Sequence, residues 1–392
     1  MQKTTVTPKY VLDFACIGSA CEDHCCHGWN INIDRDTYHF MTRKSVMKIK
    51  ASEMILRTRG ESSYARIKLN TEGECPFRQA DGLCEVHAKH GHERLSQTCK
   101  TYPRLRSVRG DQIQHSLTLS CPEAARKILL DPCAMQFDIQ SEFDPKFKPL
   151  KYTPPQGHEV IRELFLTLLS NNEQTFEQNV FTFGIALKQL AKADDSAWLS
   201  TFEQVLNQVN SGHIQTYYAD LKPVTELHTT YLLKGYNAFF ALGVLGEKTH
   251  VLNRLNLLNE QLKSALTEAE DDIAQQQAVL VKGYNEHYQT YFATRPYIWV
   301  NYFIYQMYQQ DFPSANMIDQ FKEMVTDFFF LRGALLLIAS VRPLSDADVI
   351  FVVQTYHRAR SHGGQFGKVL EGLSQQLAVD KDTLPLLMLK VC

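Results

Sequence analysis

The cysteines of this chain are concentrated near its N-terminus. Of the 10 cysteines in 392 residues, nine lie at or before Cys133 and the last is Cys392. Clustered cysteines are typical of disulfide frameworks in secreted proteins, and of metal or redox sites in cytosolic proteins, where thiols stay reduced. The compartment therefore decides which kind of structure this cysteine-rich segment can form.

The sequence shows no sign of export or membrane insertion. Its first residues, MQKTTVTPKYVLDF, lack the apolar segment and small-residue cleavage site of a secretory signal. The longest apolar run, from Phe328 to Val341, is too short for a membrane span and contains Arg332, so we expect a buried core helix. A formal net charge of -2 gives no reason to expect nucleic-acid binding. We predict a cytoplasmic protein whose clustered cysteines bind metal.

Four cysteines form a compact first group within the segment FACIGSACEDHCCHGW, namely Cys16, Cys21, Cys25 and Cys26. Thiolates are soft, charged ligands that suit zinc and iron–sulfur clusters, and one short loop supplies several of them at little entropic cost. The adjacent Cys25 and Cys26 cannot easily bind one ion together. They could bind neighbouring irons, or one of them could point elsewhere.

A second group of cysteines is spaced more widely. Cys75, Cys84 and Cys99 lie in GECPFRQADGLCEVHAKHGHERLSQTCKTYPRLRS, and Cys121 follows in SLTLSCPEAAR. Histidines between them are further candidate ligands, although a surface role is more common for such residues. These histidines are His87, His90 and His92.

Together, the two groups predict a metal or iron–sulfur centre. Buried reduced cysteines that act as small apolar residues would explain one or two of them, but not eight. A structural zinc and a [4Fe–4S] cluster each need only four ligands, so eight thiols indicate two centres, or one centre with bystanders. Cys133 and Cys392 are expected to be bystanders. The predicted metal ligands are Cys16, Cys21, Cys25, Cys26, Cys75, Cys84, Cys99 and Cys121.

Composition divides the chain into two parts. A loop-rich, cysteine-ligated metal or iron–sulfur module is predicted over 1–136 and an α-helical domain over 156–392, joined by a proline-containing connection. In the second part, VIRELFLTLL and WLSTFEQVLNQV carry apolar residues at helical spacing. Ser345, followed by Asp348, resembles a capped helix start. The expected fold class is mainly α.

Shorter elements are expected in the first part. Asp34 is placed to cap a helix that runs through YHFMTRKSVMKIKASEMILRT. The segments SYARIKLN and DQIQHSLTLS alternate enough between apolar and polar residues to form short strands. The cysteines then lie mainly in loops and at helix starts.

An aromatic stretch and a basic patch are two further features that could bind a ligand, but a structural role is favoured for each. The aromatic stretch YNEHYQTYFATRPYIWVNYFIYQMYQQDF could line a pocket for lysine or adenine, but core packing between helices is the favoured interpretation. A basic patch could hold a carboxylate or phosphate, but an exposed patch is the expectation. Its residues are Lys100, Arg104, Arg106 and Arg109.

The cysteine segments resemble a known family. CIGSACEDHCCHGW, CPFRQADGLCEVH, CKTYPR and SLTLSCPEAAR together are similar to the flagellin lysine N-methylase family. The cysteine pattern is also similar to a broader set of small proteins named for a CxxxCxxCC-type cluster and described as zinc- or iron-chelating domains. The matching segments fall within 9–126. The helical remainder agrees with the family in length and character, without a distinguishing motif.

This resemblance implies methyl transfer from S-adenosylmethionine to the ε-amine of surface lysines on flagellin. It also implies an iron–sulfur cluster held by the eight cysteines named above, expected to be [4Fe–4S], with zinc as the alternative. Polar methyl transfer needs no redox centre, so the cluster is expected to be structural or to position the methyl donor.

The catalytic and donor-binding residues stay unassigned at this point. A Rossmann-type methyltransferase would show a strand, a glycine-rich turn and a helix, and neither ALGVLGEK nor SHGGQFGK has that context. Cys21 and Cys25 have the first gap of a radical S-adenosylmethionine motif, but Cys26 breaks the second, so no radical mechanism is expected. The alternative function, from another class, is a non-enzymatic metal-binding or redox-sensing module with a helical partner-binding domain.

Overall fold

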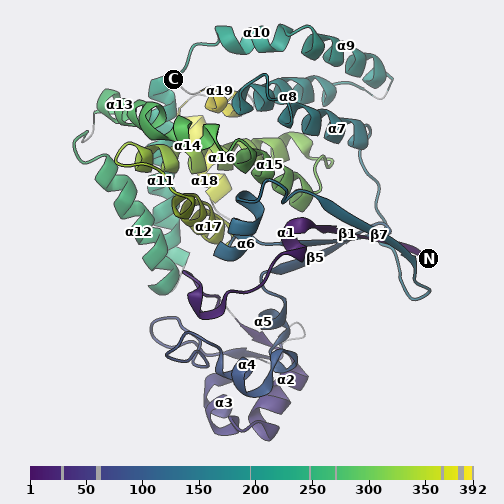
Figure 1. The fold of residues 1–392 in the computed structure, drawn as a ribbon, viewed down its shortest axis with the longest axis vertical. Helices are drawn as coiled ribbons and strands as arrows, with labels where there is room; N and C mark the ends of the chain where they lie inside the picture. Colours follow the sequence, from purple (N-terminus) through teal and green to yellow (C-terminus); the bar gives the residue numbers. More distant parts are fainter. Residues whose placement is uncertain are drawn as a thin grey trace.

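The computed structural model describes residues 1–27, 31–58, 63–194, 196–246, 249–269, 272–362, 366–377 and 384–390. Helices dominate these ranges, which confirms the mainly α class expected from the sequence. Figure 1 shows a larger helical unit with a sheet at its side, and a small unit below it. Within the described ranges, no helix is long and apolar enough to cross a membrane.

The helical unit is built from residues 158–389. The apolar faces predicted for α7 and α9 point inward, with Ile161 and Phe165 buried in α7, and Trp198 and Val205 buried in α9. The helices of this unit are α7 (His158–Leu169), α8 (Phe176–Leu190), α9 (Trp198–Asn210), α10 (His213–Asp220), α11 (Thr225–Gly246), α12 (Thr249–Ala265), α13 (Ile273–Gly283), the π-helix η4 (Tyr284–Tyr288), α14 (Gln289–Ala293), α15 (Tyr297–Gln310), α16 (Met317–Ala339), α17 (Asp346–His362), α18 (Phe366–Gln376) and α19 (Leu384–Leu389).

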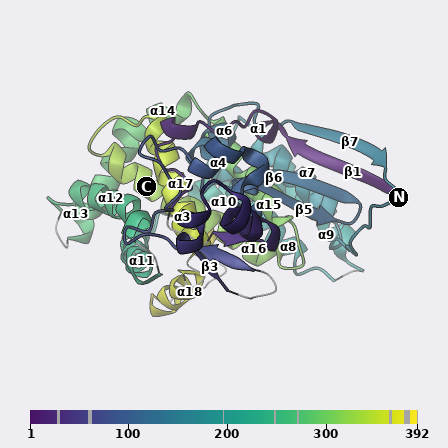
Figure 2. The same ribbon diagram turned by 90° about the horizontal axis from the view of Figure 1, so that it is seen from below.

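A four-stranded sheet projects from the helices towards the N-terminus (Figure 2). Its strand order is β5 (Arg104–Arg109), β6 (Gln112–Leu117), β1 (Gln2–Pro8) and β7 (Phe137–Phe143). β1 runs parallel to β6 and antiparallel to β7, while β5 and β6 are antiparallel. Strand β6 confirms the prediction for DQIQHSLTLS. The short helices α1 (Lys9–Leu12) and α6 (Pro122–Leu129) follow β1 and β6, and both have side chains buried in the larger core.

The small unit comprises residues 26–101 and contains four of the eight predicted cysteine ligands. Its three short strands form an antiparallel sheet in the order β2-β4-β3, which confirms the strand expected in SYARIKLN. The 3₁₀ helix η1 (Gly18–Ala20) precedes this unit. The elements of the unit are β2 (Asn32–Ile33), α2 (Arg35–His39), the π-helix η2 (Phe40–Lys44), α3 (Lys48–Met54), β3 (Ile55–Arg57), β4 (Ala65–Ile67), α4 (Glu85–His90), the 3₁₀ helix η3 (His92–Arg94) and α5 (Gln97–Thr101).

The helix expected after Asp34 is shorter than predicted. Asp34 does cap α2, where its side chain accepts a hydrogen bond from the backbone N–H of Thr37 at 2.8 Å. The chain then leaves helical geometry at Ser45, which is extended at φ -68° and ψ 149°. The Ser45 hydroxyl accepts a hydrogen bond from the backbone N–H of Met47 at 3.0 Å. Because this side chain competes for a backbone donor, it favours a turn over a continuous helix.

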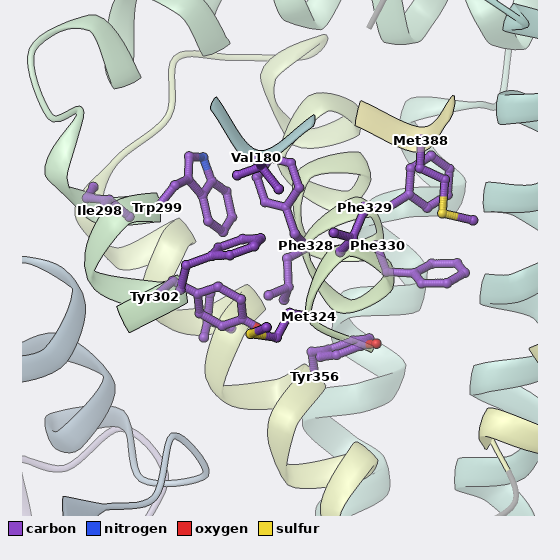
Figure 3. Close-up of a cluster of buried hydrophobic side chains, with 14 of the residues drawn as sticks. Val180, Ile298, Trp299, Tyr302, Met324, Phe328, Phe329, Phe330, Tyr356 and Met388 are labelled. Atoms are coloured by element: carbon purple, nitrogen blue, oxygen red, sulfur yellow. The ribbon is translucent and has the colours of Figure 1, made fainter. Parts of the chain in front are cut away.

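Two hydrophobic cores hold the molecule together. The larger core is rich in aromatic side chains from α15 and α16, and Figure 3 shows Trp299, Tyr302 and Phe328 packed within it. The Trp299 and Phe328 rings meet edge to face, with centroids 4.9 Å apart. These rings come from the aromatic stretch and the apolar run singled out above, so their interpretation as core packing is confirmed. The smaller core lies inside the small unit, around Ile31 and Phe77.

The larger core reaches beyond the helical unit. Tyr10, Leu117 and Ile128, which come from the N-terminal third of the chain, are buried in it together with the helices. The sheet and α6 therefore pack with the C-terminal helices, whereas the small unit has a core of its own. The domain limits of 1–136 and 156–392 drawn from composition stay a prediction.

Replacing Gly283 by alanine should destabilise the fold by about 2–3 kcal/mol. Gly283 ends α13 against the backbone of α16, and an added Cβ would lie 2.0 Å from the carbonyl oxygen of Leu336. Backbone atoms cannot swing aside as a flexible side chain can. Urea unfolding followed by circular dichroism measures the shift. In the control Gly372→Ala, the new Cβ has nothing within 4 Å, and a gain of up to ~1 kcal/mol is expected. Equal midpoints for the two variants would contradict this prediction.

Candidate functional site

One cavity brings all eight predicted cysteine ligands together. Its volume is about 250 Å³, and it lies where the small unit meets the larger one. Phe14 and Tyr102 line it from the side of the larger core, and Ile31 and Phe77 from the side of the smaller core. Its cysteine lining consists of Cys16, Cys21, Cys25, Cys26, Cys75, Cys84, Cys99 and Cys121. Segments far apart in the sequence thus contribute thiols to one space.

Four of these thiols belong to the small unit. Cys75 is buried in its core, and Cys26, Cys84 and Cys99 pack against that core. The backbone N–H of Cys75 donates to the carbonyl of Cys26 at 2.7 Å, which holds two cysteine segments side by side. Cys84 is the N-cap residue of α4, and Cys99 lies in α5, whose N-cap is Ser96. Short helices and turns therefore fix this half of the lining.

A glycine turn directs the chain back to Cys84. Gly82 has φ +83°, a left-handed conformation that favours glycine. The backbone N–H of Gln79 donates to the carbonyl of Leu83 at 2.9 Å across this turn. The backbone N–H of Glu85 then donates to the carbonyl of Phe77 at 2.8 Å. The segment from Cys75 to Cys84 is therefore a compact loop closed by backbone hydrogen bonds, and both of its cysteines line the cavity.

The other four thiols lie at the junction with the larger unit. Cys16, Cys21 and Cys25 come from residues 16–27, which we call the cysteine loop. Cys121 is the N-cap residue of α6 and is buried in the larger core. Cys16 and Cys25 are exposed, Cys21 is half-buried, and all three line the cavity. This half of the lining depends on how the cysteine loop sits against the larger unit.

Burial makes most of these thiols reluctant to ionise. It raises the pKa of Cys21 and of Cys99 to about 11, and the pKa of Cys75 and of Cys121 to about 12. The cause is the cost of placing a thiolate in a poorly solvated site, to which neighbouring thiols add repulsion. A bound cation would remove this cost, because metal coordination deprotonates thiols. The chemistry of the lining therefore fits a metal or an iron–sulfur group.

The pKa values of the adjacent Cys25 and Cys26 shift in opposite directions. A hydrogen bond from the Cys26 thiol lowers the pKa of Cys25, and the positive charge of Arg358 lowers it further. The same hydrogen bond, with burial, raises the pKa of Cys26. The sequence left open whether two adjacent cysteines could both serve one centre. The structure places both on the wall of the same cavity.

The thiols surround the cavity without forming a closed coordination shell. Over the described ranges, no group of three or more His, Cys, Asp or Glu side chains is arranged to hold a metal ion directly. None of the nine described cysteines forms a disulfide. Cys133 is exposed and is not part of the cavity lining, and Cys392 lies outside the described residues.

The residues around the thiols carry mostly positive charge. Arg94, Lys100 and Arg104 line the cavity, and the guanidinium groups of Arg94 and Arg104 lie over the rings of Phe40 and Phe14. Arg104 and Arg106 are exposed, as expected of the basic patch, and Lys100 and Arg104 also line the cavity. Positive charges favour thiolates and reduce the net charge of an anionic thiolate assembly.

Of the remaining candidate residues, two histidines line the cavity, and His90 and Arg109 make structural contacts elsewhere. His87 and His92 line the cavity, whereas Nε2 of His90 lies 2.8 Å from the hydroxyl of Ser45. Arg109 was expected in the exposed patch, but it pairs with Asp311 at 2.8 Å and donates to two carbonyl groups at the end of α15. Arg109 therefore joins the sheet to the helices.

A buried carboxylate lies at the centre of the cysteine loop. The Asp23 side chain is only 1% exposed, and His27 contacts it across 3.1 Å. Arg358 also pairs with this carboxylate, and Gln354 donates to it at 2.6 Å. Burial by itself would raise the pKa of Asp23, but the hydrogen bond with His27 and the charges of Arg358 and Arg254 outweigh it and hold the pKa well below its usual range.

Comparison with known proteins places the chain in a family. The family model described as the FliB lysine N-methylase C-terminal domain matches residues 162–387. The chain belongs to the FliB lysine N-methylase family. It is therefore a protein-lysine methyltransferase, and the resemblance noted in the cysteine segments is confirmed over the helical unit as well.

Relatives with curated names extend the similarity along the chain. The FliB-family chain is 27% identical over 391 residues to a lysine-N-methylase of Salmonella typhimurium, and the match covers 94% of each protein. A lysine-N-methylase of Salmonella choleraesuis matches with the same identity and coverage. The flagellar biosynthetic protein FliU of Salmonella muenchen is 38% identical over 148 residues, or 36% of this chain and 88% of FliU. No solved structure matches significantly.

Sequence reasoning missed the polar residues that surround the cysteine loop. Asp23 and His27 lie within the motif but were not singled out, and Arg254, Gln354 and Arg358 come from helices of the FliB-family segment. The charge of Asp23 between two cysteines was the one local signal available. Nothing in the local sequence of α12 or α17 indicates that their side chains meet a loop near the N-terminus.

Proposed function

We propose that this FliB-family chain transfers methyl groups from S-adenosylmethionine to the ε-amine of surface lysines on flagellin, and that the thiol cavity holds an iron–sulfur cluster. The observation that carries the cluster is the single cavity lined by all eight cysteines of the motif. The names of the Salmonella relatives, lysine-N-methylase and flagellar biosynthetic protein, support lysine on a flagellar protein as the substrate.

The residues present fit a cysteine-ligated cluster. Soft thiolates are the ligands that iron–sulfur clusters take, and eight of them exceed the four that one zinc ion or one [4Fe–4S] cluster requires. Cys26, Cys75, Cys84 and Cys99 pack around the smaller core, while Cys16, Cys21, Cys25 and Cys121 lie at the junction. Four thiols on each side of the cavity suit two centres, or one centre that bridges the two units.

The methyl donor would bind in an architecture other than a Rossmann fold. The sheet has one parallel pair, β1 and β6, and neither strand leads into a glycine-rich turn. β1 runs through Pro8 directly into α1, and the residues between β6 and α6 contain Cys121 but no glycine. S-adenosylmethionine, when bound, supplies a methyl group on a sulfonium centre. The cluster, when bound, would shape the junction or position that donor.

The substrate lysine must reach the donor without its proton. A lysine amine has a reference pKa near ~10.4, so it is mostly protonated at neutral pH and needs burial or a nearby base before it can attack. The carboxylates at the cavity are already engaged, Asp23 with Arg358 and Glu123 with Arg126. The imidazoles of His87 and His92 also line the cavity, and a neutral imidazole can accept a proton from an amine.

The non-enzymatic alternative loses its support once the family is known. A metal-binding or redox-sensing module would not need the helical segment of a lysine methylase, which here spans 162–387.

We place the reaction in the cytoplasm, where thiols stay reduced.

Anaerobic purification and mass spectrometry test the proposed function. Flagellin incubated with the purified protein and S-adenosylmethionine carrying a deuterated methyl group should gain labelled methyl groups on lysines. Iron and acid-labile sulfide should copurify with the protein. Flagellin without labelled lysine would contradict the methylation proposal, whereas zinc in place of iron and sulfide would contradict the cluster proposal alone. Heat-denatured protein serves as the control for non-enzymatic methylation.

A further inference from the structure

Helix α17 reaches the cysteine loop with two polar side chains, Gln354 and Arg358. They lie four residues apart and therefore on the same face of the helix. Nε2 of Gln354 donates to the Asp23 carboxylate at 2.6 Å and to the carbonyl of Ser120 at 3.0 Å. Asp23 lies between Cys21 and Cys25, and Ser120 directly precedes Cys121. One amide group thus contacts both cysteine segments at the junction.

Arg358 contacts the same loop from one turn further along α17. Its Nη1 donates to the Asp23 carboxylate, and its Nη2 donates to the carbonyl of His27 at 3.1 Å. Nη2 also lies 3.1 Å from Nδ1 of the His27 ring. The two ends of the guanidinium therefore hold the loop on both sides of the adjacent Cys25 and Cys26. A planar, forked group such as arginine suits this double contact better than a lysine ammonium.

A second helix adds to this arrangement. Nη1 of Arg254 in α12 donates to the carbonyl of Glu22 at 3.2 Å, and its Nε lies 3.7 Å from the Asp23 carboxylate. The Arg254 guanidinium lies 4.8 Å from the centre of the Phe351 ring of α17. The His27 and Asp23 side chains are 0% and 1% exposed. Charged groups buried to this degree are stable only when they are paired, so the geometry of the loop depends on both helices.

We propose that Gln354 and Arg358 are positioning residues through which the helical unit fixes Cys25, Cys26 and Cys121 and so completes the metal-binding cavity. Cys75, Cys84 and Cys99 are held within the small unit itself, whereas Cys26 packs against the core of that unit and also lies in the loop that Arg358 contacts. The metal-binding role of the cavity rests on the proposed function, whereas the control of thiol geometry by α17 does not. The helical unit of the methylase would then be needed to build the cluster site, apart from any role in binding substrate.

Thiol labelling of the metal-free, full-length protein tests the geometry without any metal. Iodoacetamide modification, read peptide by peptide in a mass spectrometer, compares Cys26 with the similarly half-buried Cys99. Arg358→Ala should raise the labelling rate of Cys26 about tenfold relative to Cys99, because local opening governs access to a thiol. Gln354→Ala should raise the rate of the buried Cys121 in the same way. Arg358→Lys keeps the charge but not the fork and should fall between the wild type and Arg358→Ala.

The metal-loaded protein gives a readout that a loss of stability alone would not move. After anaerobic reconstitution with iron and sulfide, Arg358→Ala should have a more negative reduction potential, because loss of a nearby positive charge disfavours the extra electron. Arg342→Ala is the matched control. Arg342 precedes α17 and pairs with Asp348 near its start, and its side chain is 47% exposed and is not part of the cavity lining.

The labelling outcomes decide the proposal whether or not the cluster proposal holds. The proposal would be overturned if the labelling rate of Cys26 and that of Cys121 were each the same in Gln354→Ala, Arg358→Lys and Arg342→Ala as in the wild type. This test holds even if Arg358→Ala fails to fold. Selective labelling of Cys26 or Cys121, with Cys99 unchanged, would support it. If iron and sulfide did not bind to the wild type, the cluster proposal would fail and the labelling result would still stand.

Discussion

A double variant, Cys21→Ala with Cys25→Ala, should lose bound iron and lose lysine methylation by at least about 100-fold. Both thiols line the cavity in the cysteine loop, and their removal leaves the junction side of the lining with Cys16 and Cys121. A centre that loses two of its ligands cannot keep its geometry. Iron and sulfide analysis of the purified protein, with mass spectrometry of methylated flagellin, measures both effects.

The control for this variant is Cys133→Ala. Cys133 is exposed and is not part of the cavity lining, so iron content and methylation should match those of the wild type. Full methylation after the loss of iron would show that the centre is dispensable for catalysis. Full iron content in the double variant would show that the ligands are other residues.

Substitution of a second pair of cysteines distinguishes a single metal centre from two centres. Cys75→Ala with Cys99→Ala removes thiols from the small unit and leaves the junction thiols in place. If one centre bridges the cavity, either pair of substitutions removes all the iron. If there are two centres, each pair removes only part of it.

Replacing Arg332 by methionine should destabilise the protein by about 3–5 kcal/mol. Arg332 lies in α16 with a side chain only 3% exposed, and it pairs with Glu177 of α8 at 3.2 Å. Its other nitrogen donates to the carbonyl of Met388 at 2.5 Å, at the end of α19. Methionine fills similar space but leaves the Glu177 carboxylate and the Met388 carbonyl without this partner. The shift in the urea unfolding midpoint measures the effect.

Lys322→Met is the matched control for this prediction. Lys322 lies in the same helix and pairs at 3.2 Å with Asp319, whose side chain is 77% exposed. An ion pair with such access to water contributes ~1 kcal/mol or less. Similar midpoints for Arg332→Met and Lys322→Met would show that the buried pair does not hold α8, α16 and α19 together.

The sequence predicted the composition of the site better than its surroundings. All eight candidate ligands line one cavity, as expected of clustered thiols that serve a common site. Helical spacing likewise predicted α7, α9 and the capped start of α17, where Ser345 and Asp348 exchange hydrogen bonds. These features depend on residues that are close together in the chain.

Other parts of the fold were beyond prediction from local pattern. Leu117 of β6 and Ile128 of α6 are buried with the C-terminal helices, which no local pattern indicates. The long helix expected after Asp34 ends at Ser45, where a side chain captures a backbone donor. In both cases, the outcome depends on contacts that compete with the local preference for a regular element.

The sequence by itself determined the number and the chemistry of the clustered thiols and the helical character of the chain from His158 onward. Only the tertiary structure decided which charges face the thiols, since Arg254 and Arg358 meet Asp23 across most of the length of the chain. Periodicity and ligand chemistry are properties of neighbouring residues. Burial and charge pairing instead arise when distant segments exclude water from one another, and a buried carboxylate is stable only beside the cations that folding brings to it.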